Sequence, residues 1–248
     1  MTIDIHTHLG STRMEADDVS DHTLKNHVDE LIRHMDMHGI KKAVVCPTSP
    51  NYDNDLHVAA ASMNPDRLMS ACAIIPRPLS NARKMVTHYA DEGCKAVIFD
   101  DRLYHPQDPA AYALLQASVE ANLAVYLHNA EMTSDTITFL DRASQMYPDG
   151  RFVVLHMGGL FGFPKLLPLV ARSNVWLEVS VTLIKLVESP LKVFLDALVQ
   201  DIGVRRLVFG SEHYTEYGDL RAVLNMIDLN VETSQIITKG NAKDILRL

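Results

Sequence analysis

Ile3-Asp4-Ile5-His6-Thr7-His8-Leu9 is a strand-like segment that carries two histidines, close to the start of a 248-residue chain. Because successive side chains of a strand point to opposite faces, His6 and His8 are predicted to share one face. The opposite face would then carry Ile3, Ile5, Thr7 and Leu9. Neutral imidazole is the commonest protein ligand of metal ions and suits zinc and iron, so two imidazoles at the end of one strand predict half of a metal site. Its other ligands must come from elsewhere in the chain.

Eight apolar, strand-like segments recur along the chain, and each is followed by a helical pattern. The predicted strands begin near residues 3, 42, 68, 94, 123, 151, 175 and 205, so successive starts lie 24 to 39 residues apart. Short apolar runs that alternate with helices indicate a parallel sheet covered by helices, and eight such units in about 250 residues fit a closed (β/α)8 TIM barrel. A doubly wound open sheet is the competing α/β fold, but Leu9-Gly10-Ser11-Thr12-Arg13 lacks its Gly-rich phosphate loop. We therefore predict one barrel domain over residues 1–248.

Three local expectations can be checked against the structure. A polar, acidic loop is predicted from Gly10 to about His22. The sixth strand is predicted over Arg151 to His156, and the helix after the seventh strand over Val187 to Asp201.

Composition and charge are typical of a globular protein that does not bind nucleic acid. Apolar residues make up 47% of the chain and charged residues 22%. The 31 acidic residues outnumber the 23 basic ones, for a net charge of −8, and no cluster of Lys and Arg could bind a phosphate backbone. Asp4 and His6 interrupt any early apolar stretch, and no run of about 18 apolar residues occurs, so we expect a soluble, cytoplasmic protein without a leader or membrane span. Cys46, Cys72 and Cys94 are interpreted as core thiols.

Singular polar residues fall where the predicted strands end, which is where a TIM barrel carries its catalytic groups. His6 and His8 end the first strand, His128 ends the fifth, His156 ends the sixth, and Glu212 follows the eighth. A single histidine at a strand end is more often structural, but independent placement would scatter the set along strands and helices. We therefore predict that these five residues converge at the mouth of the barrel.

These motifs resemble the amidohydrolase superfamily and, within it, the amidohydrolase-related (amidohydrolase 2) family that includes aminocarboxymuconate-semialdehyde decarboxylase-like proteins. The resemblance runs nearly end to end and is carried by Asp4-Ile5-His6-Thr7-His8, Leu31 to Ile40, Leu127-His128, Leu155-His156-Met157-Gly158-Gly159, Phe209-Gly210-Ser211 and Gly240-Asn241-Ala242-Lys243. It implies that His6, His8 and His128 bind a divalent metal ion, zinc in the first instance. It also implies that His156 stands over the substrate as a polarising or proton-transferring group.

The sequence departs from the family pattern at two places. Family members carry Asp after the Phe-Gly-Ser of strand eight, whereas this chain has Glu212, one methylene longer, as its candidate metal ligand and base. Relatives with two metals use a bridging lysine at the end of strand four. Here that strand ends at Phe99-Asp100-Asp101 and Lys95 lies near its other end, so one metal ion is expected, with Asp100 as an alternative ligand.

Hydrolysis of an ester, lactone or amide bond is the predicted reaction. A zinc-type ion lowers the pKa of its bound water to roughly 7, Glu212 accepts the proton, and His156 hydrogen-bonds to the developing oxyanion. The same residues support non-oxidative decarboxylation of a small carboxylic acid, which is the first alternative. A barrel that has lost catalysis and acts as a binding protein is the second alternative, motivated by Glu212.

Two arginines suggest that the substrate is a small acidic molecule. Arg77 follows strand three and Arg102 follows strand four, so both are placed to approach the barrel mouth, where a guanidinium can hold a carboxylate with two hydrogen bonds. Each is equally consistent with an ordinary surface arginine in a weak ion pair. The sequence leaves assembly into a homo-oligomer open.

Overall fold

A single parallel sheet forms the centre of the computed structural model, which describes residues 2–10, 21–202, 204–227 and 229–248. Its strands within these ranges are β1 (Thr2–His8), β2 (Ile40–Val45), β3 (Leu68–Ala73), β4 (Ala96–Asp100), β5 (Ala124–His128), β6 (Phe152–Val154), β7 (Val175–Val179), β8 (Leu207–Phe209) and β9 (Glu212–His213). Only Gly210 and Ser211 separate β8 from β9, so the two segments are halves of the eighth strand. Because β8 pairs with β7 and β9 pairs with β1, the eighth strand links the first strand to the seventh and the sheet curls into the predicted (β/α)8 barrel.

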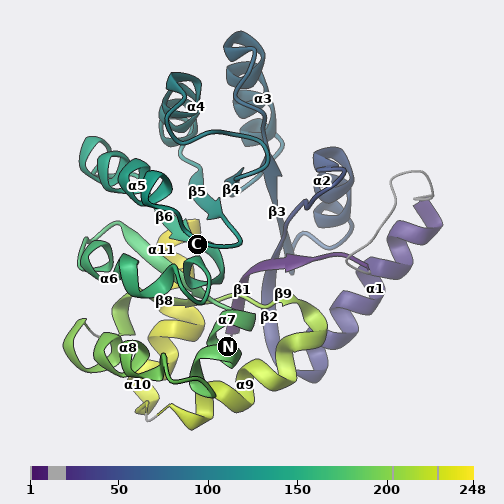
Figure 1. Ribbon diagram of the computed structural model, residues 1–248. Coiled ribbons are helices and arrows are strands. Elements are labelled where there is room, and N and C mark those ends of the chain that lie inside the picture. Colours follow the sequence, from purple (N-terminus) through teal and green to yellow (C-terminus); the bar gives the residue numbers. More distant parts are fainter. Residues whose placement is uncertain (1, 11–20, 203, 228) are drawn as a thin grey trace.

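Helices surround the sheet, and most of them cover its outer face (Figure 1). They are α1 (Asp21–Met37), α2 (Asn54–Met63), α3 (Leu79–Asp91), α4 (Pro109–Glu120), α5 (Ser134–Met146), α6 (Phe163–Val170), α7 (Val181–Val187), α8 (Lys192–Ala197), α9 (Tyr217–Met226), α10 (Val231–Gln235) and α11 (Asn241–Leu246). Local signals set their boundaries. The side chain of Asp108 caps α4 and Pro109 opens it, because proline has no N–H to leave unpaired in a first turn.

Two layers of apolar side chains pack against the two faces of the sheet. The inner layer fills the barrel and consists of strand residues and α11, including Ile3, Val44, Ile98, Tyr126 and Trp176. The outer layer joins the strands to the helices around them. All three cysteines are buried and free, which confirms their interpretation as core thiols.

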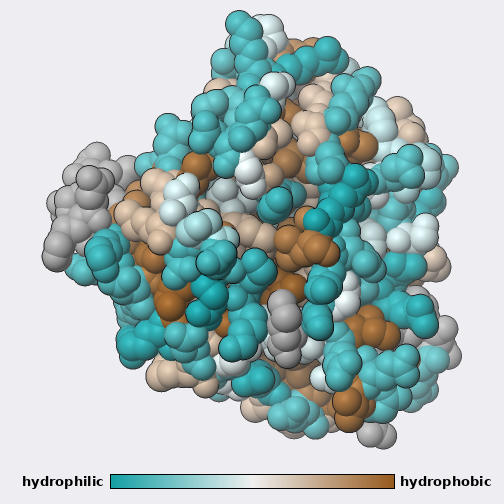
Figure 2. All heavy atoms as spheres, turned by 180° about the vertical axis from the view of Figure 1, so that it is seen from behind, coloured by the Kyte–Doolittle hydropathy of each residue, from teal (hydrophilic) through white to brown (hydrophobic). Residues whose placement is uncertain are grey.

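On the face turned away in Figure 1 hydrophilic residues predominate, and the hydrophobic residues of that face lie in separate areas (Figure 2). Within the described ranges, no helix combines the length and apolar content that crossing a bilayer requires.

The side chains of β1 do not alternate as predicted, because the strand is irregular between Asp4 and Thr7. Asp4 lies opposite Ala43 of β2 and Thr7 lies opposite Val45, so three steps along β1 match only two along β2. This is the geometry of a β-bulge, which bends a strand and re-aims its side chains. His6 therefore points into the barrel on the same side as Ile3 and Ile5, and the prediction that these isoleucines lie on the opposite face is wrong.

Three further expectations need correction or fall outside the described ranges. β6 ends at Val154, two residues before His156, because the chain turns into a short 3-10 segment over Leu155–Gly158. The helix predicted over residues 187–201 begins only at Lys192, with α8, and continues as a π-helical segment over Leu198–Ile202. Val187 instead ends α7, and Pro190 lies in the break because proline is disfavoured inside a helix. Most of the polar loop predicted after Gly10 lies outside the described residues.

Candidate metal centre

Four histidines from three parts of the chain meet inside the C-terminal end of the barrel. His6 and His8 come from β1, His128 from the end of β5, and His156 from the segment after β6. The ring centroid of His6 lies 4.8 Å from that of His8, 5.2 Å from that of His156 and 6.1 Å from that of His128. The rings of His128 and His156 are 5.0 Å apart. The structure thus brings together the histidines that the sequence places at strand ends.

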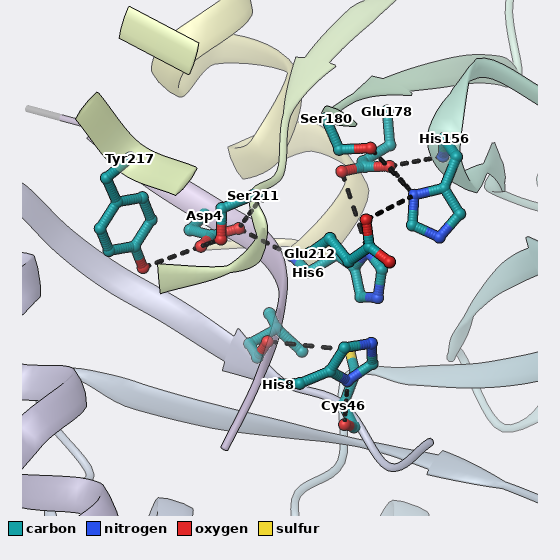
Figure 3. Close-up of polar contacts among 11 residues, drawn as sticks. Asp4, His6, His8, Cys46, His156, Glu178, Ser180, Ser211, Glu212 and Tyr217 are labelled. Carbon is teal, nitrogen blue, oxygen red and sulfur yellow. Dashed lines mark hydrogen bonds and ion pairs between the residues drawn. The ribbon is translucent and has the colours of Figure 1, made fainter. Parts of the chain in front are cut away.

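Three of these imidazoles are held in place through Nδ1. The Nδ1 atom of His8 lies 2.8 Å from the carbonyl oxygen of Cys46 (Figure 3). That of His128 lies 2.7 Å from Oδ2 of Asp100, and that of His156 lies 2.9 Å from the hydroxyl of Ser180. Because outer partners of this kind orient metal-binding histidines, Nε2 is the nitrogen that each ring has available for a ligand or substrate.

Asp100 already has partners for both carboxylate oxygens. Oδ2 faces His128, and Oδ1 accepts a hydrogen bond from the backbone N–H of Arg102 at 2.9 Å. Burial raises the pKa of Asp100, but the hydrogen bonds from His128 and Arg102 together bring it below its ordinary value. This geometry fits a carboxylate that orients His128. Lys95 directly precedes β4, at the end of the strand away from Asp100.

Glu178 on β7 is a residue of this site that sequence reasoning missed. Its side chain is fully buried in the barrel, and Oε2 accepts a hydrogen bond from the backbone N–H of His156 at 2.6 Å. Oε1 lies 3.7 Å from Nδ1 of His6 (Figure 3), and neither of these two buried atoms has a hydrogen-bond partner among the described residues. The available signal was a glutamate within Val175-Trp176-Leu177-Glu178-Val179, a strand otherwise suited to complete burial.

His6, His156 and Glu178 also form a group whose potential ligand atoms all lie within 4.8 Å of one another. Burial raises the pKa of Glu178 well above its ordinary value, and the nearby carboxylates of Glu212 and Asp4 raise it further. A buried carboxylate with an unused oxygen calls for a positive or hydrogen-bonding partner.

Asp4 joins the first strand to the last one. It is fully buried; Oδ1 accepts hydrogen bonds from the backbone N–H groups of His6 and Ser211, at 3.0 and 3.1 Å. Oδ2 accepts from the hydroxyls of Ser211 at 2.7 Å and Tyr217 at 2.9 Å (Figure 3). Asp4 therefore fixes the bulged part of β1 against the eighth strand and α9, and so holds the backbone that carries His6.

Burial favours the neutral form of His6, His8 and His156, which is the form of imidazole that binds metal ions. It lowers the pKa of His6 and of His156 well below the ordinary value, and the neighbouring imidazoles lower both further. Burial also lowers the pKa of His8 to about 4, although its hydrogen bond to Cys46 opposes the shift. Neutral imidazoles that face one another beside carboxylates, with Nδ1 of His6 buried and unpartnered, are a donor set suited to a divalent ion. The residues present thus fit a metal ion.

A cavity of about 270 Å³ opens at this end of the barrel, lined by His8, Asp100, Arg102, His128, His156 and Glu212 among others. Glu212 has a left-handed backbone with φ of 64°, and its Oε2 lies 3.9 Å from Nδ1 of His156. Burial raises the pKa of Glu212, although its side chain is still 32% exposed. A carboxylate with a raised pKa on a cavity wall is suited to accept a proton.

The two arginines predicted to bind substrate lie in different surroundings. Arg102 lines the cavity, and no carboxylate of the described residues forms an ion pair with its side chain. Arg77 is 68% exposed and binds both carboxylate oxygens of Asp108, at 2.6 and 2.8 Å. It is not among the residues that line the cavity.

Comparison with protein families finds one matching model, described as amidohydrolase, over residues 3–247. No curated protein matches the sequence. Solved structures match over the whole chain. A probable 2-pyrone-4,6-dicarboxylic acid hydrolase from Acinetobacter baumannii, with citric acid bound, has 17% identity and a TM-score of 0.73, with 100% of this chain and 99% of that one covered.

Two decarboxylases are similar to the same extent. The 5-carboxyvanillate decarboxylase of Sphingomonas paucimobilis has 15% identity, a TM-score of 0.73 and coverage of 100% and 99%. That of Novosphingobium aromaticivorans, with bound manganese and 3-methoxy-4-hydroxy-5-nitrobenzoic acid, has 16% identity, a TM-score of 0.74 and coverage of 100% and 97%. At these identities the similarity to solved structures establishes the fold.

Proposed function

Because this chain belongs to the amidohydrolase family, whose model it matches from residue 3 to residue 247, we propose that it is a metal-dependent hydrolase of a small acidic ester, lactone or amide. One observation carries the proposal. Three imidazoles with Nδ1 already engaged, the carboxylate of Glu212 and the guanidinium of Arg102 all border the same cavity. This combination provides metal ligands, a proton acceptor and an anion-binding group within one space.

His6, His8 and His128 would hold the ion, with Glu212 as a further candidate ligand. Imidazole ligands favour zinc, while the manganese bound to the Novosphingobium decarboxylase makes manganese the main competitor. A divalent ion held by these residues would polarise the substrate oxygen and lower the pKa of bound water.

Two residues of the chain would then move protons. Glu212 takes the proton of the attacking water, a role that its raised pKa and its position on the cavity wall support. His156 faces the substrate through the ring nitrogen that Ser180 leaves free, and it hydrogen-bonds to the oxygen that gains charge. Its low pKa keeps the ring neutral at pH 7, so one ring nitrogen has a proton to share and the other a lone pair.

Arg102 is the residue that leads us to propose an acidic substrate. A guanidinium without a carboxylate partner among the described residues can bind a substrate carboxylate through two hydrogen bonds. The similar hydrolase is named for a dicarboxylic acid, and the similar decarboxylases for a carboxylated vanillate. We therefore expect the scissile bond to lie close to a carboxylate of the substrate.

Non-oxidative decarboxylation is the second candidate, favoured by the two decarboxylases of the same fold. In that reaction Arg102 would orient the carboxylated substrate, and His156 would deliver the proton to the carbon atom that loses CO2.

A screen of acidic lactones, esters, amides and aromatic carboxylates, with detection of both acid release and CO2, tests the proposal on protein loaded with zinc or manganese. Acid release without CO2 supports hydrolysis, whereas stoichiometric CO2 would replace it by decarboxylation. If hydrolysis is the reaction, Glu212→Gln should lower kcat by about 10² to 10⁴-fold, because the amide cannot accept the proton of the attacking water. If Glu212→Asp and Glu212→Gln both keep the wild-type rate and metal content, then Glu212 is neither ligand nor base.

A further inference from the structure

We propose that Glu178 is a positioning residue that holds two histidines of the site at once: Oε2 fixes the backbone turn at His156, and Oε1 accepts the Nδ1–H of His6, so that Nε2 of His6 faces the metal ion. The inference rests on the metal-dependent function proposed above. It concerns a residue outside the cavity lining, on β7, a strand that carries none of the predicted ligands.

The first half of this role follows from the backbone after β6. His156 and Met157 have φ values of 54° and 53°, in the left-handed region that costs a residue with a side chain about 1 to 3 kcal/mol. Such a conformation persists only where surrounding contacts fix it. The hydrogen bond of 2.6 Å from the N–H of His156 to Glu178 is a contact of this kind, and it aims the His156 ring at the cavity.

The second half follows from the one histidine that lacks an outer partner. His8, His128 and His156 each have an oxygen within 2.9 Å of Nδ1, whereas Nδ1 of His6 has none and is completely buried. The unused oxygen that faces it is Oε1 of Glu178, at 3.7 Å. A histidine that binds a metal ion through one nitrogen almost always donates its other N–H to a carboxylate, carbonyl or water. If the distance between Nδ1 of His6 and Oε1 of Glu178 shortened to that of a hydrogen bond, both of these atoms would have a partner.

The chain makes room for the carboxylate at Gly210, in the Phe209-Gly210-Ser211 segment between β8 and β9. A Cβ atom at this position would collide with the carboxylate and the Cγ atom of Glu178. An apolar side chain at position 178 would suit a strand that is buried on both faces, and a carboxylate there costs free energy of desolvation. A buried glutamate at position 178 is therefore costly, and it also requires glycine at position 210. Its contacts with His6 and His156 explain why a glutamate occupies this position.

The competing arrangement makes Glu178 a direct metal ligand together with Nδ1 of His6 and the ring of His156, the group whose ligand atoms lie within 4.8 Å. The two arrangements differ in the nitrogen of His6 that carries the proton. A positioning role requires Nδ1–H and a metal ion on Nε2, whereas a ligand role requires the metal ion on Nδ1.

Glu178→Gln separates the two halves of the proposed role. The amide oxygen of Gln can still accept from the N–H of His156, but its NH2 group cannot accept the Nδ1–H of His6. We expect the affinity for Zn²⁺ to fall about 10- to 100-fold, with the far-UV circular dichroism and the fold unchanged. Glu131→Gln is the matched control, because Glu131 also accepts hydrogen bonds from backbone N–H groups, those of Phe161 and Gly162, rather than from an imidazole.

Zinc titration of the three proteins gives outcomes that can be told apart. Wild-type protein that binds no zinc would overturn the proposed function and this inference together. Wild-type and Glu178→Gln proteins that bind zinc equally tightly would overturn this inference alone, and so would an equal loss in Glu131→Gln.

A measurement on the wild-type protein tests the same inference without any variant. In zinc-loaded protein labelled with ¹⁵N-histidine, two-bond ¹H–¹⁵N NMR spectra identify the protonated nitrogen of each ring. We expect His6 to carry its proton on Nδ1, with zinc on Nε2. Zinc on Nδ1 would replace the positioning role by the ligand role.

Discussion

Asp4→Asn should change the way in which stability depends on pH, because Asp4 is a fully buried carboxylate at the closure of the barrel. Burial raises the pKa of Asp4 from 3.8 to about 6, even though the hydrogen bonds from Ser211, His6 and Tyr217 oppose the shift. The folded protein therefore binds this proton more tightly than the unfolded chain does.

The sign and the size of the effect follow from that difference. A group whose folded pKa is the higher one holds more protons in the folded state between the two values, so the free energy of unfolding falls as pH rises from about 4 to about 6. The whole window corresponds to about 3 kcal/mol, at about 1.4 kcal/mol per pKa unit, and the part between pH 5 and pH 7 to about 1 kcal/mol. Asparagine cannot titrate, so the Asp4→Asn protein lacks this pH-dependent contribution to the free energy of unfolding.

Urea denaturation of metal-free protein at pH 5, 6 and 7 measures the effect. The free energy of unfolding of the wild-type protein minus that of the Asp4→Asn protein should fall by about 1 kcal/mol from pH 5 to pH 7. Titration of the histidines contributes to both proteins and cancels in this difference. The same substitution at the exposed Asp149 provides the control for exchanging a carboxylate for an amide. A difference for Asp4→Asn that does not change between pH 5 and pH 7 would refute the buried, shifted carboxylate.

Three further substitutions test other parts of the site. Gly210→Ala forces a Cβ atom against Glu178 and should lower stability by about 1 to 3 kcal/mol in urea denaturation; a variant as stable as wild type would show that the space is not limiting. Asp100→Asn removes the carboxylate that orients His128 and should weaken zinc binding about 10- to 100-fold by titration, so unchanged affinity would speak against that pairing. Arg102→Ala should raise KM for an acidic substrate at least tenfold with little change in kcat, more than the same change at Arg77, and equal effects of the two variants would contradict the cavity-wall assignment.

The barrel and the meeting of its histidines can be predicted from the sequence because they depend on repetition. Eight apolar runs at regular spacing specify the parallel strands, and parallel strands carry their C-terminal residues to one end. His128 illustrates this, since its place at the end of an apolar strand is sufficient to locate it at the mouth.

The details that re-aim side chains cannot be predicted in the same way because they depend on pairing between distant strands. Alternation along β1 gives His6 the wrong neighbours, since the bulge arises where β1 meets β2. The left-handed turn at His156 depends on a hydrogen bond to Glu178, 22 residues further along. The importance of Glu178 in turn becomes evident only once the interior face of β7 is known.

Metal content is the measurement that tests the central claim most directly. Wild-type protein, loaded with zinc and freed of excess by gel filtration, should retain about one equivalent per chain by elemental analysis, and His128→Ala should retain far less and lose turnover. Wild-type protein that retains no metal ion, or a His128→Ala protein with undiminished turnover, would contradict the account.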